Sequence, residues 1–245
     1  MAKRKKLPPI NDPLQDAKRR DGINYSLIDP GEKTLLQGKE HEAKTTSKGS
    51  PQTPSPQPIE NWFRYESFYT TGRFSGLDKG FVQHCGPTAI TNILITLDRR
   101  YGYEQVAKEE PEEIFRKVAA LGRRYLFYIN RNILHYWGGS NIWLMGFYLR
   151  SALRKYGIRD RRIHLWPVAL PKMAVEQLKK GRLLLLSVYH HKIYGSHSVV
   201  AYGLQNLKGA DGCIRTYIQL ADGWAERPRY LAVEDLKLLG YCTIS

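Results

Sequence analysis

The chain has 245 residues, of which 42% are hydrophobic, and carries a formal net charge of +15. This is ample material for a core, and we expect one domain preceded by a tail. Three cysteines without a CxxC spacing argue against a disulfide framework or a zinc knuckle, and no run of about 18 apolar residues predicts a membrane span.

Residues 1–58 are rich in Lys, Gln, Ser, Thr and Pro and lack apolar periodicity. They are predicted to be a flexible, basic tail and linker, because such a composition cannot repay the entropy of ordering. Their Lys and Arg exceed their Asp and Glu by only four, so most of the positive charge lies in the domain predicted for residues 59–245. No apolar segment follows the basic start, so we expect no signal peptide and a cytoplasmic location.

A cysteine stands at the head of the most apolar predicted helix, over residues 85–97. Pro87 suits the first turn, and Ala89 and Ile93 recur at helical spacing. A thiol in this place faces unpaired backbone amides and the positive end of the helix dipole, which favour the nucleophilic thiolate. The alternative is that Cys85 packs in the core as a small apolar side chain.

Further elements follow in chain order. Helices are predicted from Pro111 to about Ala120, over the amphipathic run 142–156 with Ser140 or Asn141 as its cap, and from Pro171 to Gly181. Strands are predicted over residues 183–189, 197–204, 213–221 and 241–244. This order predicts an α+β fold in which the helix of Cys85 packs on a mainly antiparallel sheet.

The strands that contain His197 and Cys213 are separated by a turn-like segment, 206–212, which predicts a hairpin. A symmetric turn centred between Gly209 and Ala210 would pair His197 with Asp222, with their β-carbons about 4.5–5.5 Å apart. The same register gathers apolar side chains, among them Val199 and Ile214, on the face of His197. The hairpin therefore predicts an imidazole beside a carboxylate, which with Cys85 would form a catalytic constellation.

Three segments carry a resemblance to a known family: Cys-Gly-Pro-Thr-Ala at 85–89, His-Ser-Val-Val-Ala-Tyr-Gly at 197–203, and Ala-Asp-Gly-Trp at 221–224. They resemble the motifs of papain-like cysteine peptidases, in particular the bacterial, bacteriocin-processing branch called family 39-like. The resemblance covers roughly residues 59–245. It implies that Cys85 is the nucleophile, His197 the base and Asp222 the third member of a triad.

The same resemblance implies an oxyanion hole and a substrate groove. The family's usual glutamine, five or six residues before the cysteine, is absent here, where the sequence reads Asp78-Lys79-Gly80. Gln83 is the candidate to replace it, and Gly139 and Trp224 are candidates to border the groove. The predicted substrate is a peptide or a protein.

Two other functions remain open at this stage. The same triad could transfer an acyl group to an amine, as transglutaminase-like enzymes do, or the domain could be a catalytically inactive binding module that uses its basic surface. The sequence contains no nucleic-acid-binding motif, so we expect no nucleic-acid partner. His190 and His191, with His164 or His135, lack supporting ligands, so no metal or other cofactor is expected, and the sequence leaves the oligomeric state open.

Overall fold

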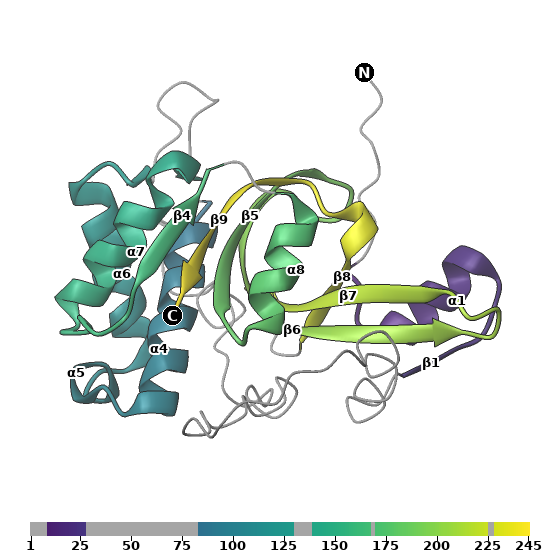
Figure 1. The fold of residues 1–245 in the computed structure, drawn as a ribbon. Helices are drawn as coiled ribbons and strands as arrows, with labels where there is room; N and C mark the ends of the chain where they lie inside the picture. Colours follow the sequence, from purple (N-terminus) through teal and green to yellow (C-terminus); the bar gives the residue numbers. More distant parts are fainter. Residues whose placement is uncertain (1–8, 28–82, 130–138, 168–169, 225–227) are drawn as a thin grey trace, which may run out of the picture.

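The computed structural model describes residues 9–27, 83–129, 139–167, 170–224 and 228–245. The protein is a mixed α and β structure built on an antiparallel sheet, with strand order β4-β9-β5-β6-β7-β8 and with β1 paired to β6 (Figure 1). The expected mixture of helices and antiparallel strands is confirmed. The predicted start of the domain at residue 59 and the segment Asp78 to Gly80 lie outside the described residues.

The helix that carries the thiol, α4 (Cys85–Tyr101), is confirmed. Every residue from Gly86 to Leu97 is buried, which explains why the sequence is apolar on almost all sides of this helix. The helix ends at Gly102, whose φ of 70° provides a left-handed cap that costs glycine little. The thiol therefore sits on a rigid, fully packed element.

The other helices surround α4 and the sheet. They are α5 (Glu104–Ala107), α6 (Pro111–Arg124), α7 (Met145–Lys155) and α8 (Pro171–Lys179). The side chains of α4, α6 and α7 share one hydrophobic core with one face of the sheet, whereas Ala174 and Leu178 of α8 belong to a second core on the other face. Asn141 accepts a hydrogen bond from the Trp143 amide at 3.0 Å, so the predicted cap precedes a 3-10 turn, Ile142–Leu144, that leads into α7.

All strand pairs of the described residues are antiparallel. The large sheet contains β1 (Tyr25–Leu27), β4 (Ile163–Trp166), β5 (Leu183–His191), β6 (Gly195–Gly209), β7 (Ile214–Ala221), β8 (Arg229–Ala232) and β9 (Leu238–Ile244). A separate pair joins β2 (Tyr128–Ile129) to β3 (Gly139–Ser140), and a 3-10 turn, Val233–Asp235, precedes β9. The four predicted strands correspond to β5, β6, β7 and β9, whereas β1, β4 and β8 were not predicted because they are short.

The predicted register of the β6–β7 hairpin is wrong. Lys208 pairs with Ile214, because β6 continues to Gly209 and the turn is centred later in the chain than predicted: the Gly209 amide bonds the Cys213 carbonyl at 2.8 Å, and Asp211 accepts from the Cys213 amide. A further irregularity between Ala201 and Gly203 shifts the register again. His197 is therefore not opposite Asp222 in the ladder, and Ile214, predicted to be inward-facing, is 61% exposed.

The prediction of a structureless tail through residue 58 is wrong for residues 9–27. Helix α1 (Pro13–Asp21) begins at Asp12, whose side chain accepts hydrogen bonds from the amides of Leu14 and Gln15, and ends at Gly22 in the left-handed conformation. Strand β1 then pairs with the far end of β6, beside α1 at the tip of the β6–β7 hairpin (Figure 1). The apolar pattern is too short to predict this helix, whose few apolar side chains, among them Leu14 and Ala17, join the second core.

The central polar contact of α1 is Asp16, which is buried against the sheet. Its carboxylate accepts hydrogen bonds from Arg19 and Arg20, both at 2.6 Å, and from the Tyr217 hydroxyl of β7 at 3.1 Å. Burial on its own would raise the pKa of Asp16, but the hydrogen bonds from the two arginines outweigh burial and lower the pKa. The ionised carboxylate therefore stabilises the docking of α1.

We expect Asp16→Asn to lower the free energy of unfolding by about 1–3 kcal/mol, because it removes one partner of a buried charge-assisted network. Since the folded-state pKa of Asp16 lies below the unfolded value, its contribution is present above pH of about 3.9 and is lost as the pH falls through the folded-state pKa. Urea unfolding at neutral pH measures the difference, which should shrink in acid. Glu112→Gln, at an exposed position, is the control, and an equal effect of both variants would contradict the assignment.

Within the described residues, no helix combines the length and the apolar character that crossing a bilayer requires.

Candidate active site

Cys85 is the first residue of α4 and is partly exposed. The Thr88 amide bonds the His84 carbonyl at 3.0 Å, and Pro87 has no amide hydrogen, so within the described residues the amides of Cys85 and Gly86 are the donors that the start of this helix leaves without an intrahelical partner. The sulfur also interacts with the backbone amide and the hydroxyl of Ser198 on β6. The thiol thus lies where donors from two elements converge, a setting that favours a negative sulfur.

Cys85 and His197 form a polar pair across the junction of α4 and β6. Burial on its own would raise the pKa of the Cys85 thiol, but hydrogen bonding to His197 and the charge of that imidazole outweigh it and lower the pKa. For His197, burial would lower the pKa, but the hydrogen bond and the charge of Cys85 raise it. The two opposite shifts favour a thiolate beside an imidazolium, which is the reactive form of a nucleophilic cysteine.

The second ring nitrogen of His197 fixes its tautomer. Nε2 lies 2.6 Å from the main-chain carbonyl oxygen of Asp222, and because a carbonyl can only accept, Nε2 must donate. Nδ1 is then the nitrogen left for the thiol of Cys85, with a lone pair in the neutral ring and a proton in the imidazolium. His197 is therefore arranged as a base toward Cys85 whatever the ionisation of Asp222.

The carboxylate of Asp222, only 1% exposed, supports this arrangement indirectly. It accepts hydrogen bonds from the Trp224 amide at 2.8 Å and from the Tyr194 hydroxyl at 3.3 Å, and it lies 3.6 Å from Arg229 Nε. Burial raises the pKa of Asp222, against the lowering effects of these neighbours and of the charge of His197. Its side chain therefore shapes the turn that presents the carbonyl to His197.

Two aromatic rings enclose the imidazole. Tyr194 stacks nearly parallel to His197, with an interplanar angle of 13° and centroids 5.7 Å apart, and Trp224 lies 4.7 Å away on a tilted plane. This contact agrees with the corrected hairpin, since the pairing of Val200 with Ala221, extended past the end of β7, places His197 across from Trp224. Trp224 is 43% exposed, so its ring borders the imidazole at the surface.

Gln83 and Gly139, two other predicted site residues, meet at the head of α4. Gln83 has a φ of 52°, a left-handed conformation that is uncommon for a residue with a β-carbon, and it turns the chain into the helix. Its side-chain oxygen lies 3.3 Å from the point where a β-carbon on Gly139 would stand. The side-chain oxygen of Gln83 thus lies close to Gly139 near the Cys85 end of α4.

Gly86 is required where β3 presses on the first turn of α4. A β-carbon at Gly86 would overlap Ser140 Oγ and stand 2.6 Å from Ser140 Cβ. We expect Gly86→Ala to lower the free energy of unfolding by about 1–3 kcal/mol, the usual cost of overpacking, and to displace β3 from the thiol. Thermal unfolding together with the rate of Cys85 alkylation measures both effects.

The matched rescue variant for this prediction combines Gly86→Ala with Ser140→Gly, which removes the colliding side chain. Stability and alkylation rate should both return toward the wild-type values. Full stability of the single variant would show that β3 does not pack on α4 as described.

Other candidate groups have structural explanations. His84 Nδ1 lies 3.0 Å from the Thr88 hydroxyl, its ring packs edge-on to Phe115, and burial lowers its pKa, as does the charge of His197. Cys242 is buried, and burial raises its pKa to about 12, whereas Cys213 is exposed in the hairpin turn. In the described part of the chain, no group of three His, Cys, Asp or Glu side chains is arranged to hold a metal ion. His135 lies outside the described residues.

Sequence reasoning missed two residues of this site. Ser198 was expected on the strand face opposite His197, yet both interact with Cys85, because the head of α4 meets β6 close to the start of that strand. Tyr194 lies three residues before His197, in the turn between β5 and β6, and its ring stacks on the imidazole. No motif signalled either residue, although a Tyr near a candidate His and Asp pair could have been considered as a hydroxyl donor.

No protein-family model matches the chain, and the search of curated proteins finds no significant match.

Proposed function

We propose that the protein is a cysteine-dependent hydrolase, a peptidase of papain-like fold in which Cys85, His197 and Asp222 act together. The observation that carries the proposal is the Cys85–His197 pair, whose pKa values move in opposite directions while Nε2 is held by the Asp222 carbonyl. The position of the thiol at the head of a buried helix that packs on an antiparallel sheet also supports a papain-like arrangement.

The chemistry follows from these positions. The Cys85 thiolate attacks the carbonyl carbon of a peptide bond and forms a C–S bond, while the Cys85 amide stabilises the developing oxyanion and Gln83 is the proposed second donor. The imidazolium of His197 gives its Nδ1 proton to the leaving nitrogen as the C–N bond breaks. Neutral His197 then takes a proton from water, which attacks the thioester, releases the acid and restores the ion pair.

The proposed substrate is a peptide or protein, and the proposed location is the cytoplasm. Cys85, Cys213 and Cys242 are all free thiols, a state that a reducing compartment maintains.

A peptide library incubated with the protein tests the proposal. Mass spectrometry should find new peptide termini and a Cys85-linked acyl group that hydroxylamine removes. Cys85→Ser should abolish both products, whereas Cys213→Ser, which changes an exposed thiol elsewhere, should leave them unchanged. Equal cleavage by Cys85→Ser would overturn the proposal. Conversion of the acyl group only to amides when amines are added would assign acyl transfer instead.

A further inference from the structure

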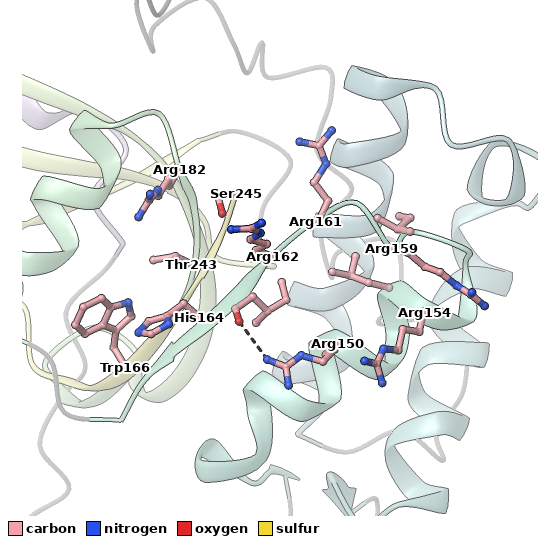
Figure 2. Close-up of a pocket in the computed structure, with 13 residues that line it drawn as sticks. Arg150, Arg154, Arg159, Arg161, Arg162, His164, Trp166, Arg182, Thr243 and Ser245 are labelled. Atoms are coloured by element: carbon pink, nitrogen blue, oxygen red, sulfur yellow. Dashed lines mark hydrogen bonds between the residues drawn. The ribbon is translucent and has the colours of Figure 1, made fainter.

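A second site is formed where arginines converge in a groove between α7 and the edge of the sheet. The groove has a volume of about 1060 Å³, and its described lining residues include no Asp or Glu. Six of the residues that line it are arginines: Arg150, Arg154, Arg159, Arg161, Arg162 and Arg182 (Figure 2). Like charges repel one another, so this concentration is costly unless an anion offsets it.

The arginines reach the groove from several elements. Arg150 and Arg154 lie four residues apart on α7, a spacing that places them on one face of the helix. Arg161 and Arg162 come from the segment that leads into β4, and Arg182 precedes β5 on the opposite side (Figure 2). The sequence alone scatters these cations over more than 30 positions, and only folding brings them together.

Several of these cations are available to a ligand. Arg161 pairs with Asp160, Arg150 donates to the Ile163 carbonyl at 3.1 Å, and Arg182 donates to Gln177. Arg154, Arg159 and Arg162 are exposed, and the structure shows no ion pair for them within the described residues. These three guanidinium groups are the principal candidates to bind an anion.

Aromatic rings line the same groove beside the arginines. The exposed ring of His164 packs edge-on to Trp166 at 4.6 Å, and Trp166 stacks on Tyr241. The indole Nε1 of Trp166 is buried and has no hydrogen-bond partner in the described part of the chain. The groove therefore offers aromatic surface from His164 and Trp166 as well as positive charge.

The positive surface continues into a smaller cavity of about 200 Å³, which shares Arg161 and Arg182 and adds Arg100 and Lys180. This cavity also contacts Tyr101, the last residue of α4, whereas Cys85 is the first. At 1.5 Å per residue, a helix of 17 residues separates its two ends by about 24 Å. The arginine groove is thus remote from the thiol.

We propose that the arginine groove binds single-stranded nucleic acid. Guanidinium groups form paired hydrogen bonds with phosphates, and aromatic rings stack with unpaired bases, which is the combination that single-strand-binding sites use. An acidic peptide would satisfy the charges but not the rings, and a flat bilayer fits a concave site poorly. This inference revises the sequence-based expectation of no nucleic-acid partner, which rested on the absence of a linear motif.

Fluorescence anisotropy with a labelled single-stranded oligonucleotide of mixed sequence, as DNA and as RNA, tests the proposal over a range of salt concentrations. The groove variant replaces Arg154, Arg159 and Arg162 with Gln. The matched control replaces three exposed lysines outside the groove, Lys172, Lys192 and Lys208, with Gln. Both variants therefore lose three positive charges. We expect the groove variant alone to bind at least about tenfold more weakly, with the slope of log K against log salt less steep by about 2.

A third variant, Trp166→Phe, tests the stacking step, since oligonucleotide binding should quench tryptophan fluorescence less than in the wild type. Equal losses in the groove and control variants would overturn the proposal, because they would show a general charge effect. Binding of a polyglutamate peptide or of anionic vesicles through the groove, without oligonucleotide binding, would also overturn it. Cys85 alkylation should be unchanged in the groove variant, which separates this proposal from the one for the thiol.

Discussion

His197→Ala is expected to slow the alkylation of Cys85 by roughly one to two orders of magnitude at neutral pH, because the thiolate loses the charge that stabilises it. In the wild type, burial raises the pKa of Cys85 and His197 more than compensates. Without the imidazole the effect of burial remains, so the pKa of Cys85 should rise and the alkylation rate should increase only in more alkaline solution. Iodoacetamide kinetics across pH, with the modified residue identified by mass spectrometry, measure both changes.

His84→Ala is the matched control for this prediction, because His84 is next to Cys85 but bonds Thr88. It should change the alkylation rate much less than His197→Ala does. Equal effects of the two variants would mean that His197 has no special role toward the thiol.

Asp222→Asn is expected to retain most of the reactivity of Cys85, with a loss of less than about tenfold. The main-chain carbonyl, not the carboxylate, holds His197, and an asparagine oxygen can still accept from the Trp224 amide. Asp222→Ala should be more damaging, because the turn would lose that hydrogen bond and the carbonyl would move. A loss of about 10⁴-fold in Asp222→Asn, as in triads whose carboxylate orients the histidine, would contradict this assignment.

The stability of these two variants gives an independent measurement. Since burial raises the pKa of Asp222, its ionised form is disfavoured in the fold, and Asp222→Asn should not lower the melting temperature. Asp222→Ala should lower it, because the Tyr194 hydroxyl and the Trp224 amide both lose their acceptor. Tyr194→Phe removes only the hydroxyl and should resemble Asp222→Asn in reactivity.

The sequence predicts the fold well where one local rule dominates. The apolar run after Cys85 could only be a buried helix, and Pro111 and Pro171 marked the starts of α6 and α8. The sequence did not predict α1, because this helix docks through contacts of Asp16 and Arg20 with residues about 200 positions away and through only a few apolar side chains. Such contacts leave no periodic signal in the sequence.

The candidate site shows the same division. The motif residues Cys85 and His197 meet as expected, yet the hairpin geometry used to join His197 to Asp222 was wrong by two to three residues. His197 still contacts Asp222, but through the main-chain carbonyl of Asp222, directly after β7, rather than through its carboxylate. A turn with an Asp side chain inside it and an irregular strand defeat symmetric register arguments, because the turn moves the centre of the hairpin along the chain and the irregularity adds one residue to β6.

The most direct test of the account is the pH dependence of Cys85 alkylation in a Cys213→Ser, Cys242→Ala background, where one thiol remains. The account predicts a midpoint below that of an unperturbed cysteine, about 8.5, because His197 and the head of α4 stabilise the thiolate. A midpoint at or above that value would contradict the account and identify Cys85 as an ordinary, partly buried thiol.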